Sequence, residues 1–358
     1  MNKKIYIGDR LLENDSKTYV IAEMSGNHNM EYERAVQILY AARECGADAV
    51  KVQTYTADTI TLDCDDPCFQ ITQGTLWDGT TLHKLYKEAY TPWEWQPKLQ
   101  KIASDIGLDF FSSPFDPTSV DFLENMNVPA YKIASFEITD IPLIRKVARL
   151  NKPVIISTGI ARLSDIELAI KTCKDEGNDN IILLKCCSAY PTPYEDINLR
   201  TMVNLESTFD CLVGLSDHTM GDAVAVASVA MGAKIIEKHL TLSREDGGVD
   251  SAFSMEPKEF KQMVDNIRIV EKALGKVTYE LTQKQTKERE HARSLFIAED
   301  MKAGDTFNEI NLRSVRPSNG LHTKYYTQLL GKKIKKDAKM GTPLSWDMID
   351  FNGSNDFV

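Results

Sequence analysis

Short apolar runs recur along the first two thirds of the chain, and each of them ends in polar residues. Eight such runs begin at Tyr19, Ala49, Asp109, Ala130, Pro153, Asn180, Cys211 and Lys234. Continuous apolar runs of about four to eight residues are typical of strands buried on both faces, as in parallel sheets. The pattern therefore predicts eight buried, parallel strands.

Helical patterns lie between these runs, for example over 32–47, 140–150, 163–177 and 221–233. Glycine is the usual residue at a helix C-terminus, and it stands just before several of the expected strands, at Gly46, Gly107, Gly177 and Gly232. Strands that alternate with helices predict an α/β fold, a (β/α)8 TIM barrel whose chemistry lies at the C-terminal ends of its strands. A doubly wound sheet is the alternative, although no G-x-G-x-x-G follows the first strand.

Two segments fall outside the regular alternation. The expected second and third strands begin 60 residues apart, and the insertion between them spans 56–91. An insertion on the active face of a barrel commonly shapes substrate choice. A polar stretch at 281–292 indicates a linker, so the expected domains are a catalytic barrel over 1–280 and a small domain over 293–358.

Composition and charge exclude several classes of protein. The 358 residues include 42 Lys and Arg against 52 Asp and Glu, a net charge of −10 that argues against a general nucleic-acid binder. No apolar run approaches the ~20 residues of a membrane span, and no apolar segment follows the basic start as in a signal peptide. The seven scattered cysteines favour reduced thiols over disulfides or zinc, so we expect a cytoplasmic protein.

Every expected strand carries polar groups at its C-terminal end. In chain order they are Glu23, Lys51, Gln53, Ser112, Ser113, Lys132, Ser135, Glu137, Ser157, Lys185, Ser188, Tyr190, Ser216, Asp217, His218, Glu237 and His239. Because the ends of parallel strands meet at one rim of a barrel, these groups are expected to form a catalytic mouth.

The lysines of this set suggest an anion site. Lys51 and Lys132 lie within apolar patterns, where an unpaired ammonium is costly and tends to lose its proton. A bound phosphate or carboxylate is a suitable partner, with the hydroxyls of Ser113, Ser135, Ser157 and Ser216 around it. A lysine acting as a Schiff-base nucleophile is the alternative.

The histidines of the set suggest a metal. His218 and His239 end neighbouring strands, and two imidazoles with open positions suit a divalent ion that also binds water and substrate oxygens. A general base beside a structural histidine is the alternative, and His28 is a weaker third candidate. Glu23 and Glu237 are candidate proton acceptors or partners that orient the imidazoles.

Together these motifs resemble a known family. IAEMSGNH, VKVQTY, FFSSPFD, YKIASFEITD, IISTGIA, LLKCCSAYPTPYED, GLSDHT and EKHLTL are similar to the sialic acid synthases, which condense phosphoenolpyruvate with sugars to make nonulosonic acids. RSLFIAEDMKAGDTF and RPSNGL resemble the antifreeze-like (SAF) domain of that family, and the resemblance covers essentially the whole chain. The insertion, together with SSPFD and DGGVDSAFSMEP, is similar to the branch that makes pseudaminic acid.

The resemblance implies a reaction, a cofactor and an assembly. Phosphoenolpyruvate would condense with 2,4-diacetamido-2,4,6-trideoxy-L-altrose, and N-acetylneuraminate or legionaminate synthesis by the same mechanism is the alternative. A Schiff-base aldolase and a non-catalytic sugar-binding protein are the more distant alternatives. The expected cofactor is Mn²⁺, with Mg²⁺, Co²⁺ or Zn²⁺ as alternatives, and the expected assembly is a homodimer in which each tail covers the partner's barrel.

The resemblance also assigns residues. His218 and His239 match metal ligands, and Glu23 is expected to manage a proton near the aldehyde or the attacking water. The phosphoenolpyruvate positions are Lys51, Ser113, Lys132, Ser135, Ser157, Ser188 and Ser216, and the sugar-facing positions are Glu23, Gln53, Glu137, Tyr190, Asp250 and Arg316. On pattern alone, Arg316 is equally an exposed turn residue. Sialic acid synthases usually have Thr at the position of Ser113 and Asn at that of Ser188, and both changes keep hydrogen-bonding capacity.

Overall fold

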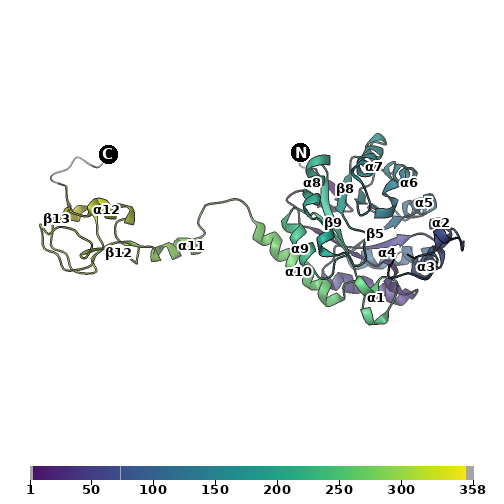
Figure 1. Ribbon diagram of the computed structural model, residues 1–358, viewed down its shortest axis with the longest axis horizontal. Coiled ribbons are helices and arrows are strands. Elements are labelled where there is room, and N and C mark those ends of the chain that lie inside the picture. The colour runs from purple at the N-terminus through teal and green to yellow at the C-terminus, as the bar shows by residue number, and fades with distance from the viewer. Residues whose placement is uncertain (1–2, 73, 352–358) are drawn as a thin grey trace. The chain divides into compact units, whose positions relative to one another are not determined.

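The computed structural model describes residues 3–72 and 74–351. It contains two compact units, Met1–Gly275 and Lys276–Val358. In Figure 1 the first unit runs from purple to green along the chain, and the second continues to yellow. No helix within the described ranges is both long enough and apolar enough to cross a membrane.

The first unit is built on a closed barrel of parallel strands in the order β10-β3-β4-β5-β6-β7-β8-β9. The strands are β3 (Tyr19–Glu23), β4 (Ala49–Thr54), β5 (Asp109–Pro114), β6 (Tyr131–Ile133), β7 (Val154–Ser157), β8 (Ile181–Lys185), β9 (Leu212–Asp217) and β10 (Ile235–His239). Each of the eight predicted runs forms one of them, so the predicted (β/α)8 barrel is confirmed. The alternative of a doubly wound sheet was wrong, because β10 pairs with β3 and leaves no edge.

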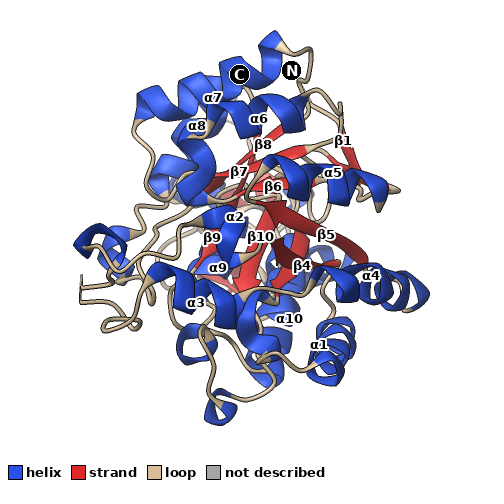
Figure 2. Ribbon diagram, turned by 90° about the vertical axis from the view of Figure 1, so that its right-hand side faces the viewer, coloured by secondary structure: helices blue, strands red, loops and turns tan. Residues whose placement is uncertain are grey.

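Helices surround the barrel, and Figure 2 shows the red strands enclosed by blue helices. The principal ones are α1 (Tyr32–Cys45), α4 (Gln96–Asp105), α5 (Pro117–Asn125), α6 (Ile141–Ala148), α7 (Leu163–Asp175), α8 (Arg200–Phe209), α9 (Ala223–Ala230) and α10 (Pro257–Leu274). The predicted stop after α1 is present: Gly46 adopts φ 85° and its N–H caps the carbonyl of Ala42. Glycine suits this left-handed position because it lacks a Cβ atom.

An N-terminal hairpin of β1 (Ile5–Ile7) and β2 (Arg10–Leu12) was not predicted. The guanidinium of Arg10 lies 2.7 Å from Asp48 Oδ1 and 3.1 Å from Asp109 Oδ2. These carboxylates stand at the N-terminal ends of β4 and β5. The hairpin therefore covers the end of the barrel opposite the polar rim.

The predicted insertion contains α2 (Ala57–Ile60), η2 (Pro67–Phe69) and α3 (Leu82–Ala89), and it is followed by η3 (Trp93–Trp95). The side chains of Thr56 and Thr81 cap α2 and α3. Trp77 Nε1 donates a hydrogen bond of 2.9 Å to the carbonyl of Val249, in the loop after β10. The insertion is thus joined to the loop that follows His239.

Short 3-10 helices follow several of the barrel strands and shape the rim. They are η1 (Ser25–His28), η4 (Ser135–Thr139), η5 (Tyr194–Asp196), η6 (Arg244–Asp246) and η7 (Ser251–Phe253).

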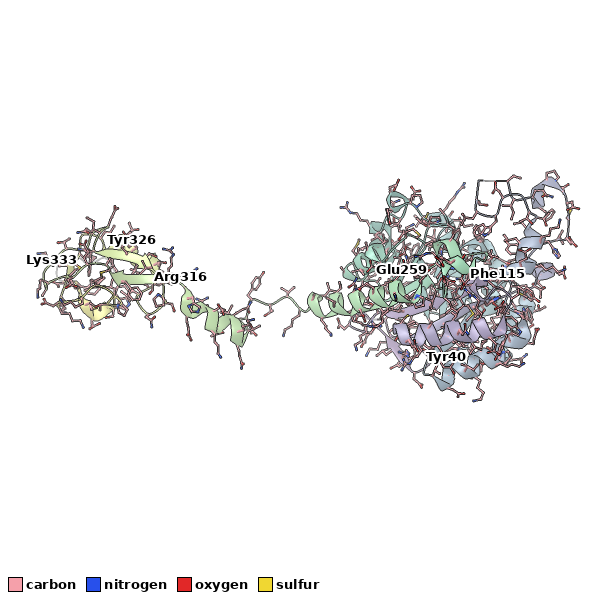
Figure 3. The ribbon with its side chains drawn as sticks, turned by 90° about the horizontal axis from the view of Figure 1, so that it is seen from below. Tyr40, Phe115, Glu259, Arg316, Tyr326 and Lys333 are labelled. Carbon is pink, nitrogen blue, oxygen red and sulfur yellow. The ribbon has the colours of Figure 1, made fainter. Side chains whose placement is uncertain are left out.

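The second unit begins with helical segments α11 (Gln283–Glu288) and η8 (Arg289–His291), within the predicted linker. It continues with β11 (Ser294–Ile297), β12 (Leu312–Val315), η9 (Thr323–Tyr325), α12 (Tyr326–Leu329), β13 (Lys333–Ile334), η10 (Trp346–Met348) and β14 (Ile349–Asp350). Leu295, Phe307, Leu312 and Leu329 belong to a small core of its own. Figure 3 labels Arg316, Tyr326 and Lys333 in this unit.

Candidate active site

Two glutamates and two lysines meet inside the barrel. Glu23, Lys51, Lys132 and Glu237 are 1%, 3%, 2% and 4% exposed. Lys51 Nζ lies 2.6 Å from Glu23 Oε2 and 3.9 Å from Glu237 Oε1, while Lys132 Nζ lies 3.5 Å from Glu237 Oε1. Buried charges of this kind persist only when they are paired, and here each ammonium has a carboxylate partner.

Burial and the neighbouring charges shift the pKa values of these four groups in different directions. Burial would lower the pKa of Lys51, but Glu23 and Glu237 outweigh burial and raise it. For Lys132 burial prevails over Glu237, and the pKa is lowered. Burial raises the pKa of Glu23 against the effect of Lys51, whereas both lysines hold the pKa of Glu237 below its usual value despite burial. Glu23 and Lys132 are therefore the members closest to losing their charge.

Serine hydroxyls surround the lysines. Lys51 Nζ donates to Ser113 Oγ at 3.3 Å, the N–H of Gly159 donates to Ser135 Oγ at 3.1 Å, and Ser216 Oγ donates to Glu237 Oε1 at 3.1 Å. Among the described residues, the buried hydroxyls of Ser157 and Ser188 have no hydrogen-bond partner. Unpartnered buried hydroxyls are costly, and an anionic ligand would satisfy them.

Gly159 keeps space open between these hydroxyls. A Cβ atom at this position would lie 2.2 Å from Ser188 Oγ, 2.7 Å from Ser135 Oγ and 3.1 Å from Cys186 Sγ. This glycine was not predicted to belong to the site, because only the folded backbone shows how close it lies to Ser188 and Ser135.

His218 and His239 lie side by side at the ends of β9 and β10, with ring centroids 5.4 Å apart. His218 Nδ1 is 3.1 Å from the carbonyl of Cys187 and 3.8 Å from Cys186 Sγ. His239 Nδ1 is buried and has no hydrogen-bond partner in the part of the chain that the structure describes. Burial and the neighbouring His218 lower the pKa of His239 and favour its neutral imidazole, the form that binds metals, whereas Cys186 outweighs burial and raises the pKa of His218.

This pair fits a divalent cation with open coordination positions. No group of three or more His, Cys, Asp or Glu side chains suited to a metal is found within 3–72 and 74–351. The protein would thus supply two imidazoles, and water and substrate oxygens would complete the coordination. That donor set and the unpartnered nitrogen of His239 agree with a catalytic rather than a structural metal.

A hydrogen-bonded chain runs from Glu23 to Asp250, whose carboxylate lies near His239. Gln53 Nε2 donates to Glu23 Oε1 at 2.9 Å and to Ser25 Oγ at 3.0 Å. Ser25 Oγ donates in turn to Asp250 Oδ2, which lies 4.0 Å from His239 Nδ1. Glu23 and Asp250 are therefore held by one network.

Aromatic rings border the histidine pair. The ring of Tyr190 lies 4.4 Å from that of His218, and Phe253 lies 5.0 Å from His239. Trp77 packs against Tyr190 at 5.7 Å. Neither Phe253 nor Trp77 was selected from the sequence. Both lie in loops, and no local sequence pattern indicates that these loops approach the site.

Three further candidates have separate positions. Glu137 Oε2 is buried and has no hydrogen-bond partner among the described residues, and burial raises the pKa of Glu137 to about 7. His28 is occupied by Thr91 Oγ1 at 3.2 Å and by the N–H of Met30 at 3.1 Å, so it has a structural role. Arg316 belongs to the second unit, where it lines a groove with Glu288, Arg289 and His291.

The sequence matches the family model described as the NeuB family over residues 38–279 and that of the SAF domain over 292–350. The chain belongs to the NeuB family. The predicted resemblance to sialic acid synthases with an SAF tail is thereby confirmed.

Within the NeuB family, the chain is more similar to some named synthases than to others. The chain is 46% identical to the pseudaminic acid synthase of Campylobacter jejuni strain 81-176, over 92% of this chain and 96% of that protein. It is 35% identical to the N,N'-diacetyllegionaminic acid synthase of Legionella pneumophila, over 93% of this chain and 94% of that protein. A solved N-acetylneuraminic acid synthetase from Leptospira borgpetersenii has a TM-score of 0.71 and 30% identity, covering 80% of this chain and 95% of its own.

Proposed function

We propose that the chain is an enzyme that condenses phosphoenolpyruvate with 2,4-diacetamido-2,4,6-trideoxy-β-L-altropyranose and water, giving pseudaminic acid and phosphate. The observation that carries this proposal is the 46% identity to a pseudaminic acid synthase over 92% of the chain. The buried lysines and the paired histidines at the barrel mouth are the groups that such chemistry requires.

Lys51 and Lys132 bind phosphoenolpyruvate in this account. In the ligand-free barrel their charges are balanced by Glu23 and Glu237, and the phosphate and carboxylate of the substrate become additional partners for them. Ser113, Ser135 and Ser216 donate from around the lysines. Ser157 and Ser188 supply the unpartnered hydroxyls, and charge-assisted hydrogen bonds of this kind hold phosphate strongly.

The carbon–carbon bond forms between C3 of phosphoenolpyruvate and the aldehyde carbon of the open-chain sugar. The aldehyde oxygen gains a proton, and water adds to the cationic C2. The tetrahedral intermediate then releases phosphate by cleavage of its C–O bond. Glu23 holds or moves the proton near the aldehyde or the attacking water, because burial raises the pKa of its carboxyl and makes the protonated form easier to reach.

His218 and His239 hold the divalent ion, for which we propose Mn²⁺ before Mg²⁺, Co²⁺ or Zn²⁺. When bound, the ion supplies a Lewis acid for the aldehyde oxygen. Gln53, Glu137, Tyr190 and Asp250 are the proposed sugar contacts from the same chain. Their hydrogen-bonding atoms and the Tyr190 ring lie around the histidine pair or at the end of β6.

We further propose a cytoplasmic homodimer in which each SAF domain covers the partner's barrel and contributes Arg316. The segment joining the two units supports an interface, because Val277 and Tyr279 are 92% and 96% exposed. Large exposed apolar side chains close together often mark contact surfaces. The boundaries 1–280, 281–292 and 293–358 stay a prediction. Mixing Arg316→Ala with His239→Ala subunits tests the exchange, since mixed dimers would regain one complete site.

Two alternatives are tested along with the proposal. Legionaminic or N-acetylneuraminic acid synthesis would use the same residues with another sugar. A Schiff-base aldolase is favoured by one observation, the lowered pKa of Lys132. Borohydride added with phosphoenolpyruvate and sugar would trap a covalent adduct only in that case.

The proposal is tested directly by following the bridging oxygen of phosphoenolpyruvate into the products. Phosphoenolpyruvate labelled with ¹⁸O in the bridging C–O–P position should transfer the label to the released phosphate, and mass spectrometry should detect pseudaminic acid. Unlabelled phosphate would contradict C–O cleavage, and the absence of any sugar product would refute the condensation.

A further inference from the structure

A second ion pair lies behind the two proposed metal ligands. Lys238 Nζ is 2.6 Å from Asp217 Oδ2, and both side chains are fully buried at 1% and 0% exposure. Side chains alternate along a strand, so Lys238 points away from the face to which Glu237 and His239 contribute. The mechanism proposed above does not use this pair.

The pair determines the conformation of the turn that carries His218. Asp217 Oδ1 accepts the N–H of Thr219 at 2.9 Å, and Lys238 Nζ donates to the carbonyl of Thr219 at 2.6 Å. Both backbone groups of Thr219 are thereby held, and His218 lies between the two anchored residues.

The same pair also joins β9 and β10 at the residue before His239. Lys238 and Asp217 are direct partners in the parallel pairing of β10 with β9, and His239 follows Lys238 in the chain. The ammonium of Lys238 thus connects β10, which ends at His239, to the turn that follows His218. A displacement of either strand end would change the distance between the two imidazoles.

Stability alone does not explain this arrangement. Removing two charges from water is costly, and a buried ion pair is often no more stabilising than apolar side chains of the same volume. Its directional hydrogen bonds, in contrast, select one geometry. Partners behind metal-binding side chains commonly orient them and influence metal affinity.

We infer that Lys238 and Asp217 are positioning residues that pre-organise His218 and His239 for a divalent cation. The inference rests on the proposed assignment of these histidines as the metal ligands. It predicts that the metal-free barrel folds without the ion pair but binds the cation weakly, because the two imidazoles then no longer have one fixed separation.

The test replaces the pair by apolar side chains in the full-length protein, as Lys238→Met with Asp217→Leu. The matched control is Lys261→Met with Asp265→Leu, which removes an exposed pair of 2.8 Å on α10. Mn²⁺ binding to the chelator-treated proteins is measured by calorimetry and by the electron paramagnetic resonance of free Mn²⁺. We expect Kd to rise about 10- to 100-fold in the buried variant and less than twofold in the control.

Circular dichroism and the melting temperature of the metal-free proteins report folding. If the buried double variant does not fold, Asp217→Asn removes the charge and keeps an oxygen for the Thr219 N–H. A folded variant that binds Mn²⁺ as tightly as the unmodified protein would overturn the inference. If the unmodified protein itself binds no Mn²⁺, the metal assignment under the proposed function fails instead.

Discussion

Glu23 and Lys51 face each other across the neighbouring strands β3 and β4, and their charged atoms lie 2.6 Å apart inside the barrel. The pairing allows Lys51 to remain charged in an apolar interior. It also holds the carboxylate of Glu23 in place beside His239, its partner in the pairing of β10 with β3. It also connects Lys51 to the Gln53–Ser25–Asp250 network.

Glu23→Gln tests the proton-managing role. The amide keeps the size and a hydrogen bond to Lys51 but takes up no proton, so we expect kcat to fall about 100-fold or more, with a smaller change in KM for phosphoenolpyruvate. The control is Glu33→Gln on the exposed face of α1. Steady-state phosphate release measures both parameters. Near-normal turnover by the Glu23 variant would refute the role.

Gly159→Ala tests the anion cradle. The added Cβ would come within 2.2 Å of Ser188 Oγ, so the hydroxyls must separate and KM for phosphoenolpyruvate should rise about 10-fold or more. Gly221→Ala is a useful control, because this glycine has φ +72° but no atom within 4 Å of a Cβ. It should lower the melting temperature and leave KM unchanged. An unchanged KM for Gly159→Ala would show that the cradle lies elsewhere.

Trp77→Ala tests whether the insertion forms part of the sugar site. Its ring supports Tyr190, and its Nε1 is bonded to Val249. We expect KM for the sugar to rise about 5- to 50-fold, as the loss of one aromatic contact and one hydrogen bond would give, while KM for phosphoenolpyruvate stays constant. Leu76→Ala, at the exposed neighbouring position, is the control. Equal changes in both KM values would indicate a general loss of structure.

Glu137 predicts a pH dependence of stability. Burial raises its pKa from 4.5 to about 7 in the folded protein. The unfolded chain therefore releases this proton first as the pH rises, so the cost to folding grows from pH ~4.5 and is complete above pH ~7. Glu137→Gln should then stabilise the ligand-free protein by about 1–3 kcal/mol at pH 8 and by little at pH 5.

Urea unfolding at the two pH values measures this difference, with Glu195→Gln at an exposed position as control. Equal stabilisation at both pH values would contradict an ionised, poorly solvated carboxylate at Glu137.

The barrel was predictable because its signals are local. Strands such as Ile181–Lys185 are buried on both faces and therefore consist of continuous apolar runs, and glycines mark the ends of the helices before them. Because the ends of parallel strands meet at one rim, the sequence alone was enough to bring Lys51, Lys132 and Glu237 together. It did not show that Asp217, expected at the same mouth, lies on the opposite face in an ion pair with Lys238.

The features that were not predicted depend on contacts between segments that are distant in the sequence. The contact of Trp77 with Tyr190, the space beside Gly159 and the pair of Lys238 with Asp217 all join residues far apart in the chain or in different loops. The β1–β2 hairpin was missed because its strands have three residues each, too few for a periodic pattern. His28 was considered as a ligand because sequence does not show that Thr91 and Met30 satisfy its ring.

Phosphate release from phosphoenolpyruvate is the measurement that decides whether the protein catalyses metal-dependent condensation with a sugar of altrose configuration. Chelator-treated protein is assayed with and without Mn²⁺, using the altrose-configured diacetamido sugar, its legionaminic-type isomer and N-acetylmannosamine. We expect Mn²⁺-dependent release that is much the fastest with the first sugar. Release with another sugar alone would contradict the pseudaminic assignment, and no release with any of the three would contradict the condensation itself.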